Sequence, residues 1–170
     1  MIVLITGGAR SGKSAYAEAL AAASGMEVVY IATAKALDAE MADRIAHHRA
    51  RRPREWRTVE APLMLADTLR ENAHQNRCLL IDCLTLWLTN LLSIEPSAAE
   101  ASRQDFLAAL GEARGTVIVV TNEIGMGVVP LGELSRRFVD DMGRLNQAVA
   151  ARADRVVLMV AGLPASVKGA

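Results

Sequence analysis

The sequence predicts an α/β fold with a mostly parallel central sheet flanked by helices, in a single domain that spans residues 1–170. Three observations support this. Short segments rich in Val, Ile and Leu alternate with amphipathic helical stretches, as expected where helices connect parallel strands. Most of the short segments are continuously apolar, so both faces of each strand should be buried. A glycine-rich motif joins the first strand to the first helix.

The expected elements follow in chain order. Strands are predicted at Ile2–Thr6, Val28–Ala32, Leu79–Asp82, Thr116–Thr121 and Arg155–Val160. Helices are predicted at Lys13–Ala23, Asp38–Arg51, Pro62–Ala73, Leu84–Ser93, Ser97–Ala113 and Glu133–Ala151, and the last of these places Leu134, Phe138, Leu145 and Val149 on one stripe. Ligands of such sheets bind at the carboxyl ends of the strands, so a functional site is expected there.

The glycine-rich motif is a phosphate-binding loop. Residues 7–14 read Gly7-Gly8-Ala9-Arg10-Ser11-Gly12-Lys13-Ser14 and match G-x-x-x-x-G-K-[ST], between a strand and a helix. Successive backbone N–H groups of the loop can surround a phosphate at the positive end of the helix. We expect Lys13 to contact the outer phosphates and the Ser14 hydroxyl to bind Mg²⁺. The alternative is a glycine turn that matches by chance, and the flanking strand and helix disfavour it.

Composition excludes several functions. Nineteen Lys and Arg balance nineteen Asp and Glu, which argues against a nucleic-acid-binding protein and against a polybasic membrane arm. The apolar run at residues 2–5 is too short for a signal peptide, and no stretch is long enough for a membrane span. A cytoplasmic protein is expected. Cys78 and Cys83 are the only cysteines, and buried thiols are a better interpretation of them than a disulfide or a shared metal site.

Asp82 ends a buried strand that follows the phosphate loop in the chain. A carboxylate in this position is the usual second Mg²⁺ partner in enzymes with a phosphate-binding loop. The alternative is that Asp82 caps the helix that begins near Leu84. The presence of the phosphate loop favours the metal role.

His48 is the second candidate for chemistry. On a helix over residues 38–52, it shares a stripe with Met41, Ile45 and Arg52, whereas His47 lies off that stripe. An arginine on an inward face suits phosphate oxygens, and nearby cations favour the neutral imidazole that can act as a nucleophile. Spacing alone leaves a nucleophile and a hydrogen-bonded core histidine equally open. The sequence has no histidine and cysteine spacing that is typical of a zinc site.

A loop at residues 121–130, Thr-Asn-Glu-Ile-Gly-Met-Gly-Val-Val-Pro, follows the fourth predicted strand. Its length and its position on the ligand side of the sheet favour a role in substrate binding over that of a simple connection. It contains no Asn-Lys-x-Asp motif for guanine, which disfavours an ordinary regulatory GTPase.

Several motifs together resemble one family. They are residues 6–14, Tyr30-Ile31-Ala32-Thr33, Ile45-Ala46-His47-His48-Arg49 leading to Arg52-Pro53, Trp56-Arg57-Thr58, Thr89-Asn90-Leu91-Leu92 and Thr121-Asn122-Glu123-Ile124-Gly125-Met126-Gly127. They are similar to those of the bifunctional adenosylcobinamide kinase / adenosylcobinamide-phosphate guanylyltransferase, over nearly the whole chain. The histidine pair and the Asn-Glu-x-Gly-Met-Gly loop are more specific than the phosphate loop.

The resemblance implies a P-loop NTPase fold of the RecA-like type, a homotrimer and two reactions. In the first, ATP or GTP phosphorylates adenosylcobinamide. In the second, GTP transfers GMP to that phosphate through a guanylyl-histidine, which would be His48, and yields adenosylcobinamide-GDP and pyrophosphate. The resemblance also implies that the nucleotide is contacted by Gly7, Gly8, Ala9, Arg10, Ser11, Gly12, Lys13, Ser14, Ala32, Thr33, Ala34, Arg49, Ala50, Arg51, Arg52, Glu60 and Asp82.

Two other functions stay open on the sequence. One is a P-loop kinase of another small molecule, without guanylyl transfer. The other is a module that binds a nucleotide without turnover, which the many motifs on the ligand side disfavour. Covalent labelling by GTP separates the bifunctional enzyme from the plain kinase.

Overall fold

The computed structural model describes residues 1–35, 39, 43, 46, 49–50 and 52–169. The strands are β1 (Ile2–Gly7), β2 (Glu27–Ala32), β3 (Arg57–Glu60), β4 (Arg77–Asp82), β5 (Thr116–Val120), β6 (Arg155–Val160) and β7 (Leu163–Lys168). The helices are α1 (Lys13–Ala22), α3 (Leu65–Asn72), α4 (Leu84–Leu91), α5 (Pro96–Glu112) and α6 (Glu133–Arg152). The helix predicted over Asp38–Arg51 falls largely outside the described residues.

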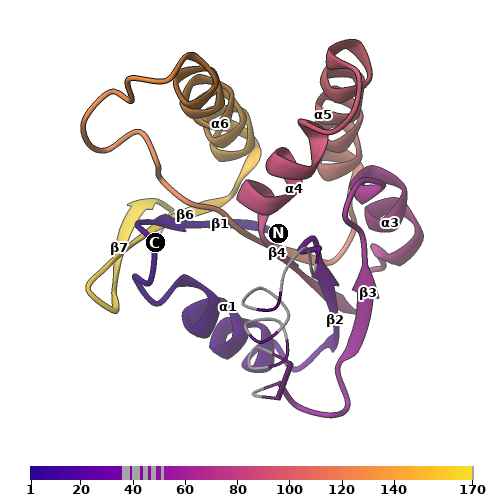
Figure 1. Cartoon of the computed structure of the whole chain (residues 1–170). Coiled ribbons are helices and arrows are strands. Elements are labelled where there is room, and N and C mark those ends of the chain that lie inside the picture. The colour runs from indigo at the N-terminus through magenta and orange to yellow at the C-terminus, as the bar shows by residue number, and fades with distance from the viewer. Residues whose placement is uncertain (36–38, 40–42, 44–45, 47–48, 51, 170) are drawn as a thin grey trace.

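The described strands form one sheet in the order β3-β2-β4-β5-β1-β6-β7 (Figure 1). Neighbouring strands are parallel except β6 and β7, which are antiparallel. The predicted α/β fold with a mostly parallel sheet is therefore confirmed. β1, which leads into the phosphate loop, lies between β5 and β6, and β4 lies beyond β5. The carboxyl ends of these strands meet at one edge of the sheet.

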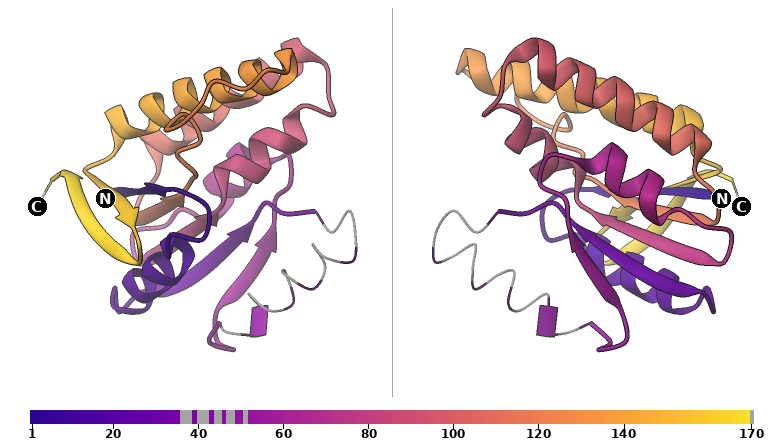
Figure 2. Two further views of the ribbon diagram at one scale, coloured as in Figure 1. Left: turned by 60° about the vertical axis from the view of Figure 1, so that its left-hand side comes forward. Right: turned by 90° about the vertical axis from the view of Figure 1, so that its right-hand side faces the viewer.

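Helices cover both faces of the sheet (Figure 2). On one face, α3, α4, α5 and α6 bury a large cluster that includes Leu4, Ile31 and Trp87. On the other face, α1 packs Ala17 and Ala21, both fully buried, against a smaller cluster that includes Tyr30. Because alanine side chains are small, the backbone of α1 lies close to the strands, and the phosphate loop is held at the edge of the sheet.

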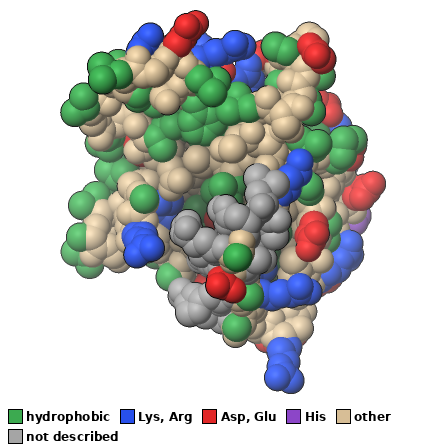
Figure 3. All heavy atoms as spheres, viewed as in Figure 1, with side chains coloured by type: hydrophobic (Ala, Val, Ile, Leu, Met, Phe, Trp, Pro, Cys, Tyr) green, Lys and Arg blue, Asp and Glu red, His purple; other side chains and the backbone are tan. Residues whose placement is uncertain are grey.

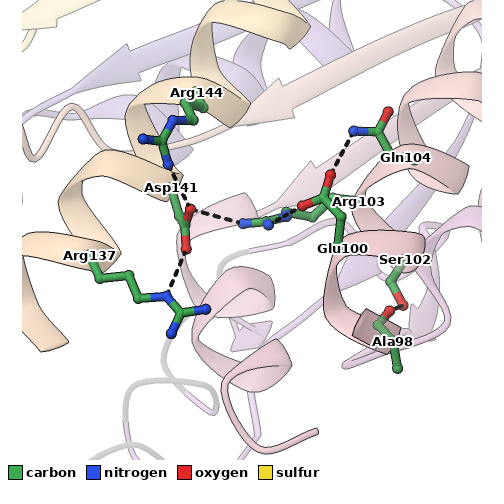
Figure 4. Close-up of polar contacts among 8 residues, drawn as sticks. All are labelled: Ala98, Glu100, Ser102, Arg103, Gln104, Arg137, Asp141 and Arg144. Atoms are coloured by element: carbon green, nitrogen blue, oxygen red, sulfur yellow. Dashed lines mark hydrogen bonds and ion pairs between the residues drawn. The ribbon is translucent and has the colours of Figure 1, made fainter. Parts of the chain in front are cut away.

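An ion pair connects the two outer helices α5 and α6, and further ion pairs within each helix surround it (Figure 4). Asp141 of α6 is only 16% exposed and lies 3.3 Å from Arg103 Nη1 of α5. The same carboxylate is 3.2 Å from Arg144 Nη1 and 4.0 Å from Arg137 Nε. Glu100 contacts Arg103 from the other side and accepts a 2.8 Å hydrogen bond from Gln104. The Arg103–Asp141 pair therefore adds a polar contact between two helices that also pack on the core.

The structure differs from the sequence-based expectation in two strands and one helical turn. β3 and β7 were not expected, because both are edge strands with mostly exposed side chains and no continuous apolar run. The apolar stripe of α6 packs on the core from Phe138 onward, and Leu134 is 66% exposed. The remaining boundaries agree to within a few residues. No helix in the described parts of the chain has the length and apolar character needed to cross a membrane.

Candidate functional site

The phosphate loop connects β1 to α1, as predicted. Gly7 has a φ of 148°, and a Cβ atom there would lie 2.5 Å from the Met159 carbonyl oxygen. Gly12 has a φ of 94° and is the N-cap residue of α1, without a side-chain cap. Only glycine combines these left-handed conformations with such close approach. The loop therefore leaves the first N–H groups of α1 without a side-chain partner, as an anion site requires.

Lys13 lies inside this loop rather than in solvent. Its side chain is 7% exposed, and Nζ donates a 2.6 Å hydrogen bond to the carbonyl oxygen of Gly8. Burial lowers the pKa of Lys13 below its ordinary value of 10.5, while the nearby Cys83 and Asp82 act in the opposite direction. A buried ammonium that donates to one carbonyl among the described residues is well placed to exchange that partner for phosphate oxygens.

The turn between β6 and β7 contacts the phosphate loop through the backbone. The Gly162 N–H donates to the Ser11 carbonyl oxygen at 3.1 Å. A Cβ atom on Gly12 would lie 3.3 Å from the Gly162 Cα, so the two backbones are in contact. Ser11 Oγ is buried and has no hydrogen-bond partner among the described residues. Sequence reasoning missed this support, because β7 itself was not expected.

Asp82 ends β4, and its carboxylate is held by a tyrosine. Tyr30 Oη donates a 3.0 Å hydrogen bond to Asp82 Oδ2. Burial, and then the charge of Asp82, raise the pKa of Tyr30 far above its ordinary value, so the hydroxyl stays protonated. The alternative role as a cap of α4 is not what the structure shows, because the N-cap residue of that helix is Cys83. The second carboxylate oxygen of Asp82 accepts no described hydrogen bond.

Arg52 completes a row of three side chains on this face of the sheet. Its guanidinium carbon lies 3.4 Å from the centre of the Tyr30 ring, a cation–π contact. Tyr30 thus separates a cation from a carboxylate and touches both. Sequence reasoning named Arg52 and Asp82 but not Tyr30, and the only signal for it was its place in the Tyr-Ile-Ala-Thr motif.

Thr33 fastens the ends of β2 and β4 together. Its hydroxyl donates to the Cys83 carbonyl oxygen at 2.7 Å and accepts from the Cys83 N–H at 2.8 Å. The Asn90 side chain of α4 donates to the Thr33 carbonyl oxygen at 2.8 Å and to that of Pro62 at 3.0 Å. Ala32 lies in register between Glu60 of β3 and Asp82 of β4. These contacts link the carboxyl ends of β2, β3 and β4 to one another and to α4.

Some of the remaining predicted nucleotide contacts are described by the structure, and others are not. Glu60 is exposed at the end of β3, Ala34 is half-buried beyond β2, and Arg49 and Ala50 are exposed. His48 and Arg51 lie outside the described residues, so the choice of His48 as the nucleophile stays a prediction.

A magnesium ion is compatible with the donors that are present. Among the described residues, no group of three or more His, Cys, Asp or Glu side chains is placed to bind a metal. Mg²⁺ at phosphate sites needs only one or two protein oxygens, with phosphates and water completing its shell. The half-buried Ser14 hydroxyl and the oxygen of Asp82 that Tyr30 does not contact are such donors.

The loop at residues 121–130 begins beside the phosphate loop. The Glu123 N–H donates to the Gly7 carbonyl oxygen at 3.0 Å. Further along, Met126, Val128, Val129 and Leu131 are 72% to 98% exposed, and Figure 3 shows hydrophobic side chains gathered over this loop and α6. A cavity of about 310 Å³ lies between the loop and α6, lined among others by Ile124, Arg136 and Asp140. The loop therefore joins the phosphate site to a second, partly apolar surface.

Comparison with known proteins places these features in one family. Residues 3–167 match the family described as cobinamide kinase / cobinamide phosphate guanyltransferase. The chain is 62% identical over 167 residues to the bifunctional adenosylcobalamin biosynthesis protein CobP of Pseudomonas aeruginosa, covering 98% of this chain and 96% of that protein. It is 43% identical over 182 residues to the bifunctional adenosylcobalamin biosynthesis protein CobU of Escherichia coli, covering 99% of this chain and 100% of that protein.

Solved structures with low sequence identity share the fold. An ATPase of a bacterial type III secretion system superposes with a TM-score of 0.57 at 14% identity, over 97% of this chain and 56% of that one. The RadB recombinase superposes with a TM-score of 0.53 at 18% identity, over 92% and 73%. The P-loop NTPase fold of the RecA-like type is therefore confirmed. With the family match over nearly the whole chain, we conclude that this protein belongs to the cobinamide kinase / cobinamide phosphate guanyltransferase family and is a bifunctional enzyme of cobalamin biosynthesis.

Proposed function

We propose that the enzyme phosphorylates the aminopropanol hydroxyl of adenosylcobinamide with ATP or GTP, and then transfers GMP from GTP to that phosphate. The products of the second step are adenosylcobinamide-GDP and pyrophosphate. The observation that carries the proposal is the buried Lys13, held inside a glycine loop next to Asp82. This arrangement suits the phosphates of a nucleoside triphosphate at the edge where the family motifs converge.

In the kinase step, an alcohol oxygen attacks the γ-phosphorus and the bond to the β,γ-bridging oxygen breaks. Such a transition state needs positioning and charge neutralisation more than covalent help. Lys13 exchanges the Gly8 carbonyl for phosphate oxygens, and the N–H groups of residues 8–14 bind the rest. Ser14 and Asp82 would hold Mg²⁺, which when bound would neutralise further phosphate charge.

In the guanylyl step, we assign the nucleophile to His48. Its imidazole nitrogen attacks the α-phosphorus of GTP, and the bond to the bridging oxygen breaks so that pyrophosphate leaves. An oxygen of the cobinamide phosphate then attacks the same phosphorus, and the P–N bond breaks. Two displacements by way of a neutral imidazole avoid a direct encounter of two phosphate anions. Arg52, four residues beyond His48 in the chain, supplies positive charge on this side of the site.

Incubation with GTP labelled at the α-phosphate, in the presence of Mg²⁺ and the absence of corrinoid, tests this proposal. We expect label on the protein that acid removes and base does not, as for a phosphoramidate. His48→Ala should abolish labelling, and the neighbouring His47→Ala is the matched control that should keep most of it. Labelling that survives in His48→Ala and disappears in His47→Ala would refute the assignment. GTP binding without label on either protein would instead favour direct transfer or a plain kinase.

We further propose that the enzyme is a cytoplasmic homotrimer. The exposed apolar side chains of the loop at residues 121–130 are compatible with burial between subunits. Sedimentation equilibrium at several protein concentrations tests the stoichiometry, and a monomeric mass throughout would contradict it.

A further inference from the structure

The kinase step requires a group that accepts the proton of the attacking alcohol. Among the described residues, three carboxylates stand at the carboxyl ends of strands: Glu60 is the last residue of β3, Asp82 is the last residue of β4, and Glu123 follows β5. In the sheet, β3 is separated from β1 by three strands, so Glu60 is remote from the phosphate loop. One oxygen of Asp82 is bonded to Tyr30, and the other is assigned to Mg²⁺. Glu123 follows β5, which is the strand directly beside β1.

Glu123 is anchored to the phosphate loop and held from the other side. Its N–H donates to the Gly7 carbonyl oxygen at 3.0 Å, which ties its backbone to the first residue of the loop. Its Oε2 lies 3.5 Å from Nδ2 of the buried Asn146 on α6. Asn146 is itself fixed, because it accepts from the Thr121 hydroxyl at 2.8 Å and donates to the Asn122 carbonyl oxygen at 3.0 Å.

The Glu123 carboxylate also has acceptor capacity to spare. Its one described side-chain hydrogen bond is the long contact with Asn146, and no described Lys or Arg forms an ion pair with it. With no described cation bound to it, the Glu123 carboxylate has oxygen lone pairs available to accept a hydrogen bond from an incoming alcohol. A Cβ atom added to Gly125, which lines the cavity, would lie 3.7 Å from Glu123 Oε1, so this oxygen lies near the cavity lining.

We propose that Glu123 is the general base of the kinase step, and this inference rests on the proposed function. As the acceptor's alcohol oxygen forms its bond to the γ-phosphorus, its proton passes to the Glu123 carboxylate. The bond between the γ-phosphorus and the bridging oxygen breaks, and the nucleoside diphosphate leaves with that oxygen. The acceptor is an alcohol that enters between the phosphate loop and the loop at residues 121–130. Asn146 is a positioning residue that orients the carboxylate.

Glu123→Gln tests the proposal, because it keeps the shape and the backbone hydrogen bond but removes the basic oxygen. We expect kinase turnover of adenosylcobinamide to fall by about 10²-fold or more. Self-guanylylation by α-labelled GTP, and transfer to supplied adenosylcobinamide phosphate, should stay within about threefold of wild type, since neither step deprotonates an alcohol. Glu133→Gln, an exposed carboxylate in the first turn of α6, is the matched control and should retain both activities.

Chemical rescue separates a base from a structural residue. Formate should restore part of the kinase turnover of Glu123→Ala, because a small carboxylate can occupy the vacated space, and it should not affect the control. Unchanged kinase turnover in Glu123→Gln would overturn the proposal. Parallel loss of kinase and guanylyl transfer, without rescue by formate, would overturn it in favour of a structural role. A wild-type enzyme that guanylylates adenosylcobinamide phosphate but does not phosphorylate adenosylcobinamide would refute the kinase half of the proposed function itself.

Discussion

Removal of the Tyr30 hydroxyl measures how firmly the Asp82 carboxylate is held. Tyr30 is 3% exposed, and its Oη donates to Asp82 Oδ2 at 3.0 Å. A hydrogen bond to a charged group contributes about 1.5–3 kcal/mol. Because Asp82 is half-buried and water can partly replace the lost donor, we expect Tyr30→Phe to lower the free energy of unfolding by about 1–2 kcal/mol. The phenyl ring stays in place below Arg52.

Tyr30→Leu is the matched variant that removes the ring as well. It loses the cation–π contact with Arg52, worth about 0.5–1 kcal/mol, in addition to core packing. Urea unfolding followed by circular dichroism should therefore rank wild type above Tyr30→Phe, and Tyr30→Phe above Tyr30→Leu. Binding of a fluorescent GTP analogue, titrated with Mg²⁺, should need more Mg²⁺ in Tyr30→Phe. Equal stability of wild type and Tyr30→Phe, with the same Mg²⁺ requirement, would refute the reasoning.

Four further outcomes are expected. Lys13→Met should abolish nucleotide binding yet unfold at higher urea near pH 7. Burial lowers the pKa of Lys13 below 10.5. The stability of the wild type should therefore rise relative to that of Lys13→Met as the pH increases toward 10.5. A constant difference between their urea midpoints at all pH values would contradict this. Iodoacetamide at about pH 8 should modify Cys78 and Cys83 slowly until urea unfolds the protein. Burial raises the pKa of both thiols, and it raises the pKa of Cys83 to about 11. Gly115→Ala should lower the free energy of unfolding by about 2 kcal/mol or more, because φ is 86° and the added Cβ atom would lie 2.2 Å from a carbonyl oxygen. Thermal unfolding measures this, and an unchanged Tm would count against the turn geometry. Asp141→Ala should lower the free energy of unfolding by about 1–2 kcal/mol, because three arginines lose the carboxylate that they share. The difference from the wild type should be smaller at high salt. A difference that does not depend on salt would argue against ion pairing.

Much of the fold could be predicted because the information is local. Continuous Val, Ile and Leu runs marked the five inner strands, and β6 begins and ends at the predicted residues, Arg155 and Val160. The phosphate loop was recognisable because backbone geometry there demands glycine at fixed spacing. β3 and β7 were missed for a physical reason. An edge strand with exposed side chains needs no apolar pattern, and its hydrogen bonds to a neighbour leave no mark on composition.

The contacts between distant segments could not be predicted from one sequence. Tyr30 and Asp82 are 52 positions apart, and their hydrogen bond depends on β2 and β4 being adjacent in the sheet. The support of Ser11 by Gly162 depends likewise on the turn after β6. Charge and burial together identified Asp82 and Arg52 as candidates, but only the folded structure shows that a tyrosine lies between them.

The place of β1 in the sheet has a consequence for synthesis of the protein on the ribosome. β1 pairs with β5 and β6, which are translated more than a hundred residues after β1 and the phosphate loop. Until those strands emerge, β1 is an unpaired apolar segment, of the kind that nascent-chain chaperones bind. The turn at Gly162, which holds the Ser11 carbonyl, emerges later still. The phosphate loop is therefore translated well before the strands and the turn that hold it in place.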